Sequence, residues 1–228
     1  MNRHKNGKTG PPGFRKKDRF GFEENAFYEA EAYSKIERDV LNGQGSLMKT
    51  RSLVLAALCA ALIGVLAQVA VPVPFSPVPF TGQMLGVFLT GAVLGRKLGV
   101  ISVLTYVLLG VLGLPVFARG MSGVSVLLGP SGGYLVGFVA GVYVLGFVVE
   151  RGTEGERGYL RSAAGMLLCL IITYLFGLVQ LSLVMNLSFK EALLVGAVPF
   201  IPVDVVKALL AARLAVPVRK ALRSAGML

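Results

Sequence analysis

An acidic and a basic side chain stand three residues apart in an otherwise apolar stretch near the end of the chain. Asp204 and Lys207 belong to the segment Pro-Phe-Ile-Pro-Val-Asp-Val-Val-Lys at residues 199–207. Residues at i and i+3 share one face of a helix, and ionisable groups at membrane depth normally face a protein interior or a wet cavity. The pair is therefore either part of a ligand site or a salt bridge that fixes the last helix. The loops and side chains at the same end of the molecule decide between these two interpretations.

The composition identifies an integral membrane protein. Hydrophobic residues make up 54% of the chain, charged residues only 15%, and the mean hydropathy is +0.71, which excludes an ordinary soluble domain. Because each spanning helix needs about 20 apolar residues, the chain can supply about five or six of them. The net charge of +11 does not indicate nucleic acid, because beyond Arg51 the basic residues lie mostly in short gaps between apolar runs, as membrane topology requires.

The residues that build metal centres and nucleophilic sites are scarce. Cys59 and Cys169 are isolated within apolar runs, and His4 is the only histidine. A structural or catalytic zinc ion needs three or four such ligands in one place, and Ser131 has no histidine to activate it. We therefore expect no metal, no cofactor and no enzymatic activity.

The first 50 residues differ from the rest of the chain. They are polar, carry charges of both signs, and contain too few apolar residues to bury a core. We expect residues 1–50 to form a disordered extension and residues 51–228 to form the membrane domain. Met48 begins a short basic lead into the first apolar run and is an alternative start of the protein, which a terminal peptide from native material would test.

Six apolar segments predict an all-α bundle of six transmembrane helices. The segments cover approximately residues 52–70, 83–95, 98–112, 134–150, 162–183 and 193–216, with the last one broken or kinked at Pro199 and Pro202. Arg96 and Lys97 lie between the second and third segments, and a charged connector covers residues 150–161. With the amino terminus in the cytoplasm, the positive-inside rule places these basic connections and the carboxyl terminus inside.

The remaining connections then face outward and carry the unusual sequences. A near-repeat at residues 72–80 holds four prolines and predicts an extended or turning loop, and residues 113–133 form a glycine-rich loop that is long for a mere connection. Both structured loops are expected above the Asp204/Lys207 pair. This arrangement favours a binding site over a structural salt bridge.

Polar and aromatic side chains at this outer end suit a small amphipathic ligand such as an organic acid. The candidates are the amide of Gln83, the ring and hydroxyl of Tyr134, the ring of Phe117, the carboxylate of Asp204, and the cations Lys207 and Arg119.

Four motifs in one order resemble the BioY family, the biotin-binding substrate components (S-components) of energy-coupling-factor (ECF) transporters. They are Pro-Phe-Thr-Gly-Gln at residues 79–83, Gly-Leu-Pro-Val-Phe at 113–117, Gly-Pro-Ser-Gly-Gly-Tyr at 129–134, and the Asp204/Lys207 segment at 199–207. The resemblance covers roughly Met48 to Val216. It departs at Arg119, where a small residue is expected, and at Val203, where glycine is expected.

The resemblance implies biotin capture from outside the cell by a multi-pass protein of the cytoplasmic membrane, surrounded by lipid. It also implies a transmembrane coupling subunit with two cytoplasmic ATPases as partners, which fits a chain that contains no ATP-binding motif. The substrate-binding residues expected from the resemblance and the outer constellation together are Gln83, Phe117, Arg119, Gly132, Tyr134, Asp204 and Lys207. The small-residue strip expected to dock the coupling subunit comprises Ala56, Ala57, Ala60 and Ala61, although packing within the chain explains such a strip equally well.

Three alternatives stay open at this point. The same scaffold can carry another vitamin or a biotin precursor, which a ligand screen would detect. A solitary ion-coupled transporter of a small organic acid would use Asp204 as its protonatable group, and its uptake would collapse with the ion gradient. A membrane scaffold without a ligand would tolerate apolar replacement of both Asp204 and Lys207.

Overall fold

A computed structural model describes residues 34, 50–152 and 155–227. Met48–Leu228 forms a compact unit of its own. The expected extension at residues 1–50 and the alternative start at Met48 lie outside the described residues, apart from Ser34 and Thr50.

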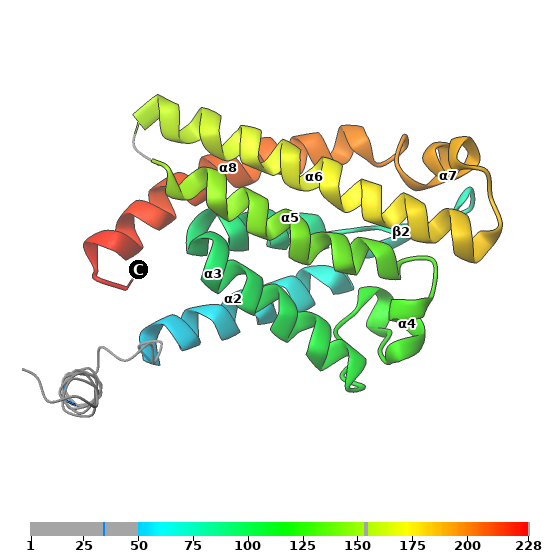
Figure 1. Cartoon of the computed structure of the whole chain (residues 1–228), viewed down its shortest axis with the longest axis horizontal. Coiled ribbons are helices and arrows are strands. Elements are labelled where there is room, and N and C mark those ends of the chain that lie inside the picture. The colour runs from blue at the N-terminus through cyan, green and yellow to red at the C-terminus, as the bar shows by residue number, and fades with distance from the viewer. Residues whose placement is uncertain (1–33, 35–49, 153–154, 228) are drawn as a thin grey trace, which may run out of the picture. The chain divides into compact units, whose positions relative to one another are not determined.

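Helices account for most of the described chain (Figure 1). The long ones are α2 (Thr50–Gln68), α3 (Gln83–Val111), α5 (Gly132–Glu150), α6 (Gly155–Met185) and α8 (Ile201–Ser224), and the short ones are η1 (Ala118–Gly120), α4 (Val124–Leu128) and α7 (Phe189–Gly196). By length and apolar composition, four of the described helices can cross a membrane, or five if α7 and α8, bent by 54°, count as one broken span. Large apolar side chains such as Leu108, Leu175 and Leu210 remain more than half exposed, at 57%, 53% and 53%. A surface of this kind suits lipid rather than water, and the protein is a multi-pass membrane protein.

The expected second and third helices are the two arms of α3. Gly95 interrupts α3 with non-helical dihedrals, φ 80° and ψ −171°, and the side-chain amide of Gln83 donates a hydrogen bond of 2.6 Å to the hydroxyl of Tyr106. In a straight helix these two residues would be about 34 Å apart, at about 1.5 Å per residue. The chain therefore reverses at Gly95, immediately before Arg96 and Lys97. Counting α2, both arms of α3, α5, α6 and the α7–α8 pair, the described residues contain the six helical segments that the sequence predicts.

The expected proline loop is a β-hairpin. Strands β1 (Ala70–Val73) and β2 (Ser76–Thr81) pair antiparallel, with Ala70 opposite Thr81 and Val71 opposite Phe80. Prolines lack an N–H group and are confined to strand edges, and both strands of a two-stranded sheet are edges. The sequence analysis predicted the extended backbone but not the strand pairing.

Two helix boundaries differ from the prediction. Helix α6 begins at Gly155, so most of the expected charged connector forms its first turns, and only residues 151–154 remain between α5 and α6. Helix α8 continues through Pro217 to Ser224, beyond the expected end near Val216. Charged side chains in both extensions keep these turns polar.

Helix α5 packs closely against α6 through glycines. A methyl group added at Gly137 would lie 2.7 Å from the Cα atom of Thr173, and one added at Gly141 would lie 2.7 Å from the sulfur of Cys169. Backbones approach this closely only where side chains are absent. The glycines of α5 therefore let the backbones of the two helices come into contact.

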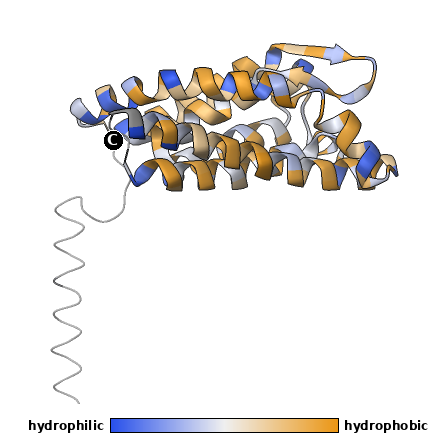
Figure 2. Cartoon of the chain, turned by 90° about the horizontal axis from the view of Figure 1, so that it is seen from above, coloured by the Kyte–Doolittle hydropathy of each residue, from blue (hydrophilic) through white to orange (hydrophobic). Residues whose placement is uncertain are grey.

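The two ends of the helical unit differ in character. The β-hairpin, η1, α4 and α7 lie at one end, which we call the loop end, and the α3 reversal, the α5–α6 connection and the carboxyl-terminal turn of α8 lie at the other, the basic end (Figure 1). Figure 2 shows the helices hydrophobic along most of their length, with hydrophilic residues gathered near the C terminus. The structured loops thus gather at the end opposite the basic residues.

Candidate ligand-binding site

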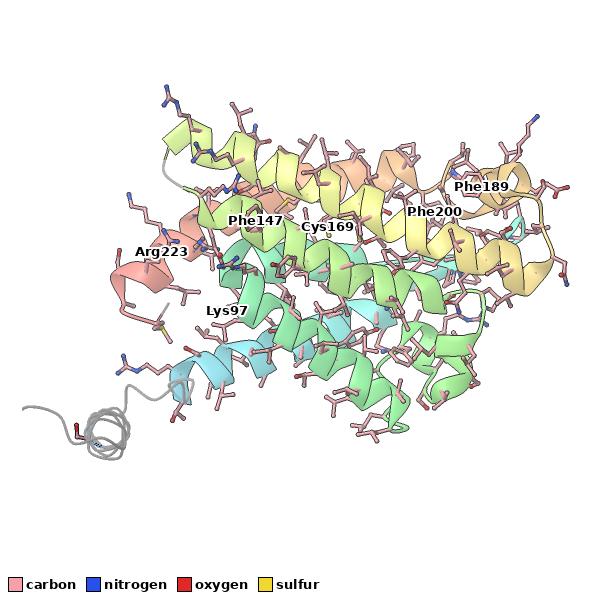
Figure 3. The ribbon with its side chains drawn as sticks, viewed as in Figure 1. Lys97, Phe147, Cys169, Phe189, Phe200 and Arg223 are labelled. Atoms are coloured by element: carbon pink, nitrogen blue, oxygen red, sulfur yellow. The ribbon has the colours of Figure 1, made fainter. Side chains whose placement is uncertain are left out.

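A cavity of about 70 Å³ lies at the loop end, enclosed by β2, the η1 region, α3, α5, α6 and α8. Its apolar walls include Met84, Phe117, Phe138, Leu170 and Phe200. Figure 3 shows Phe200 near α7, at the end of the unit away from Lys97 and Arg223. The polar side chains that line it are Thr81, Gln83, Ser131, Tyr134, Thr173, Tyr174, Asp204 and Lys207. An apolar enclosure with a few converging polar groups is the usual form of a small-molecule site.

Asp204 and Lys207 form an ion pair that opens onto this cavity. The ammonium of Lys207 donates 2.7 Å hydrogen bonds to Oδ1 of Asp204 and to the carbonyl of Thr81. The hydroxyl of Tyr174 donates to Oδ2 of Asp204 at 2.7 Å. An ammonium has three N–H groups and each carboxylate oxygen has two lone pairs. Among the described residues, one N–H group of Lys207 therefore has no acceptor, and each carboxylate oxygen of Asp204 can accept one further hydrogen bond. These groups can bind a ligand.

The start of the last helix explains why this pair is so placed. Helix α8 begins with Ile201 and Pro202, and Pro202 needs no N–H partner in the first turn of a helix. Asp204 lies in this same first turn, where the positive end of the helix dipole favours a carboxylate. One turn further on, Lys207 reaches the backbone of the β-hairpin at Thr81. The pair therefore ties α8 to the strand above the cavity.

One wall of the cavity is built from three side chains in contact, those of Gln83, Tyr106 and Phe117. Gln83 begins α3 and donates to the hydroxyl of Tyr106, whose ring meets the ring of Phe117 edge-on with centroids 5.6 Å apart. The Phe117 ring lies so close to Gly110 that a methyl group there would come within 2.2 Å of it. Glycine at position 110 is therefore what allows Phe117 to reach the cavity wall.

Tyr134 is held on the opposite wall. Its hydroxyl donates to the carbonyl of Gly196 at 2.9 Å, and its ring meets that of Tyr174 edge-on at 6.3 Å. A methyl group at Gly177 would lie 2.4 Å from the Tyr134 ring. Tyr134 thus connects α5, α6 and α7 at the side of the cavity.

Five of the seven expected binding residues line the cavity, and two do not. Arg119 is exposed within η1 and has a positive φ of 62°. Gly132 is buried beneath α4, where a methyl group would collide with the carbonyl of Leu127 at 1.7 Å. The structure therefore gives Gly132 a packing position and places Arg119 beside the cavity rather than on its wall.

Tyr174 and the carbonyl of Thr81 are site features that the sequence reasoning missed. Tyr174 lies in an apolar run, 30 residues before the carboxylate that it contacts. A tyrosine hydroxyl within a membrane helix needs a polar partner, and this is the signal that would have pointed to it. The partner's identity depends on how α6 is rotated, which its nearly uniform hydrophobicity leaves open.

The small-residue strip on α2 has two differently placed halves. Ala56 and Ala60 are buried in the bundle, with 3% and 4% of their surface exposed, whereas Ala57 and Ala61 are exposed. The exposed pair lines a shallow apolar groove that continues over Thr105 and Leu109 of α3. One half of the strip thus packs within the chain, and the other half remains on the surface.

These features define a multi-pass helical membrane protein with an apolar cavity, lined by a few polar groups, at one end. The chain belongs to the BioY family, whose model matches residues 39–224. The chain is 42% identical over 170 residues to the biotin transporter BioY of Thermotoga maritima, covering 75% of this chain and 96% of that protein. It is 41% identical over 173 residues to the biotin transporter BioY of Rhizobium etli, covering 73% and 92%.

A solved structure has the same fold. It is the crystal structure of the S-component for biotin from an ECF-type ABC transporter, with a TM-score of 0.71 and 30% sequence identity. The similarity covers 76% of this chain and 95% of that one.

Proposed function

We propose that this protein captures biotin and takes it up across the cytoplasmic membrane as the substrate-binding component of an ATP-driven ECF transporter. The observation that carries the proposal is the enclosed cavity with the Asp204/Lys207 pair at its wall, in a chain whose relatives are biotin transporters. The protein acts as a transporter subunit and catalyses no reaction of its own.

The chemistry of the cavity suits biotin. Biotin carries an apolar ring system, a ureido group with N–H donors and a carbonyl, and a carboxylate at the end of its chain. Asp204 accepts from N–H groups or orients Lys207, whose remaining N–H meets an oxygen of the ligand. The rings of Phe117 and Tyr134 pack against the apolar part, while Gln83 supplies an amide. Gly132 supports the wall through the close packing of α4, and Arg119 acts at the entrance.

The cavity is small for a site that binds an organic molecule. Its volume of about 70 Å³ compares with about 300–1,000 Å³ for typical small-molecule pockets. The β-hairpin and the η1 region, which roof it, therefore move apart to admit biotin and close again over it. The Lys207 contact with Thr81 is one of the bonds that this movement breaks.

The charge distribution supports an orientation with the loop end outside. Arg96, Lys97, Arg151 and Lys220 all belong to the basic end, and basic connections remain in the cytoplasm. Both termini of the membrane domain are then cytoplasmic, and the cavity faces the external solution from which the vitamin is taken.

The energy source lies in partner proteins. The sequence contains no ATP-binding motif, and a transmembrane coupling subunit with two cytoplasmic ATPases supplies the energy. The exposed residues Ala57 and Ala61 of α2 let a partner helix approach closely, and the buried Ala56 and Ala60 hold α2 against the bundle.

The deciding experiment is equilibrium binding of biotin to the purified protein in detergent, beside the variant Asp204→Asn/Lys207→Ala. Saturable binding by the parent that disappears in a folded variant supports both the substrate and the site. Equal binding by both proteins would remove the site assignment. No binding by a folded parent would return the question to other vitamins, tested by a ligand screen.

Transport measurements separate a partnered protein from a solitary one. Uptake in cells should require the coupling subunit and its ATPases and should persist when the ion gradient is dissipated with ATP maintained. Uptake that collapses with the gradient and needs no ATPase would favour an ion-coupled transporter with Asp204 as the protonatable group.

A further inference from the structure

A second polar cavity lies at the basic end of the unit. It encloses about 370 Å³ between the start of α2, the reversal of α3, the end of α5 and the last turns of α8. Figure 3 shows Lys97 and Arg223 at this end, far from Phe189 and Phe200 at the loop end. The transport function described above makes no use of it.

The lining of this cavity carries an excess of positive charge. Among the residues that the structure describes, its lining holds four cations, Arg96, Lys97, Arg219 and Arg223, and one carboxylate, that of Glu150. Glu150 is already engaged, because its Oε2 lies 3.0 Å from Nε of Arg96 and its Oε1 accepts from the backbone N–H of Arg96 at 2.9 Å. Four cations against one carboxylate leave the described lining with an excess of positive charge, which attracts an anion.

Arg219 supplies an independent sign of a missing acceptor. Only 4% of this residue is exposed, and its Nη1 donates to the carbonyls of Ala92 and Val93 at 2.9 and 3.2 Å. These carbonyls belong to the last turn before Gly95, so one edge of the guanidinium caps the first arm of α3. Its Nε has no hydrogen-bond partner among the described residues. A buried charged N–H without an acceptor is costly, and a guanidinium beside a cavity is well suited to oxygens of a phosphate.

The surroundings of the cavity favour an amphipathic anion. Leu94 and Leu98 line it beside the cations, and Leu53, next to the lining residue Ser52, is 48% exposed on the outer face of α2. The cavity therefore joins a cationic patch to an apolar helix surface at the end of a membrane bundle. Basic pockets between membrane helices at this level bind anionic headgroups. We propose that it binds the phosphate group of an anionic phospholipid such as phosphatidylglycerol.

The test uses two double variants with the same change in charge at the same end of the molecule. Lys97→Gln/Arg223→Gln removes two cations from the cavity, and Arg157→Gln/Lys220→Gln removes two exposed cations outside its lining. Delipidated, purified full-length protein is titrated with phosphatidylglycerol, with phosphatidylcholine of the same acyl chains, and with inorganic phosphate. Native mass spectrometry counts the bound molecules. Biotin binding by all three proteins verifies their fold if the proposed function holds, and thermal unfolding verifies it independently.

The expected result is saturable binding of one phosphatidylglycerol that exceeds binding of phosphatidylcholine and weakens about 25-fold in the cavity variant, at about fivefold for each cation near the headgroup. The control variant should bind as the parent does. Equal binding of the two lipids, or equal loss in both double variants, would overturn the proposal. Inorganic phosphate that binds as tightly as the lipid and shares its dependence on the cavity would overturn the assignment to a lipid and leave a soluble-anion site.

Discussion

At the scale of single residues, the Asp204/Lys207 pair holds α8 to the β-hairpin and is also the centre of the proposed binding site. The two side chains are mostly buried and joined at 2.7 Å, and Tyr174 and Thr81 complete their hydrogen bonding. Desolvation consumes much of what such a pair gains in attraction. Its retention in an apolar wall is therefore better explained by a ligand than by stability.

Single and double replacements should separate the two roles. Lys207→Met leaves the carboxylate of Asp204 without its cation and should lower the free energy of unfolding by about 3–5 kcal/mol, whereas Asp204→Asn/Lys207→Met should recover much of that loss. Thermal unfolding in detergent measures the stability and equilibrium binding measures the function. Biotin binding should be lost in both proteins. A double variant that is stable and still binds biotin would leave the pair without a role in recognition.

We expect Tyr174 to position the carboxylate of Asp204, to which its hydroxyl donates a hydrogen bond. Tyr174→Phe removes the hydrogen bond to Oδ2 of Asp204 and should lower the free energy of unfolding by about 1.5–3 kcal/mol, because the lost acceptor is charged. It should also weaken biotin binding by roughly tenfold, as the carboxylate is then free to turn. The matched control is Tyr143→Phe on the exposed face of α5, which is 50% exposed and should change neither quantity. Unchanged biotin affinity in Tyr174→Phe would limit this hydroxyl to a structural role.

At the scale of elements, the reversal of α3 at Gly95 brings Gln83 and Tyr106 together. The dihedrals of Gly95, φ 80° and ψ −171°, lie in a region that essentially only glycine adopts. A methyl group there would also lie 2.6 Å from Oε1 of Glu150, the group that holds Arg96. Backbone strain and steric crowding would therefore both oppose a side chain at position 95.

Gly95→Ala should therefore destabilise the protein by about 1–3 kcal/mol. Gly64→Ala on α2 is a suitable control, because its added methyl group meets its nearest atom at an ordinary 3.5 Å. Thermal unfolding of both variants in the same detergent makes the comparison. Equal stability of the two variants would mean that the turn at Gly95 relaxes without cost.

Prediction from the sequence succeeded where a local pattern determines the structure. Arg96 and Lys97 marked the turn in α3, and the repeated prolines required extended backbone at the β-hairpin. The pairing of β1 with β2 and the contact of Tyr174 with Asp204 depend on how distant segments meet. Uniformly apolar helices carry little information about their rotation, because in lipid both faces are hydrophobic. For the same reason the sequence did not distinguish the buried Ala56 from the exposed Ala57.

At the scale of the whole molecule, the two ends of the bundle carry different chemistry. The loop end holds the cavity that we assign to biotin, and the basic end holds the cationic cavity around Arg219. This asymmetry is the basis of the proposed orientation, since basic connections stay in the cytoplasm.

Cysteine labelling in intact cells tests the orientation. In a background with Cys59→Ala and Cys169→Ala, Lys190→Cys on α7 should react with a membrane-impermeant maleimide added from outside. Lys220→Cys on α8 should react only after the membrane is opened. Both positions are exposed, so access of the reagent depends on the side of the membrane. The reverse pattern would place the substrate cavity on the cytoplasmic side.

The short first arm of α3 determines how deep in the membrane the cavity lies. From Gln83 to Leu94 this arm is only about 18 Å long at about 1.5 Å per residue, against a hydrocarbon core of about 30 Å. In the proposed orientation, with Gly95 near the inner surface of the membrane, Gln83 and the cavity wall at the start of this arm lie below the level of the outer headgroups. The captured molecule then begins its passage already inside the membrane, and the distance left for the transport machinery to cover is correspondingly shorter.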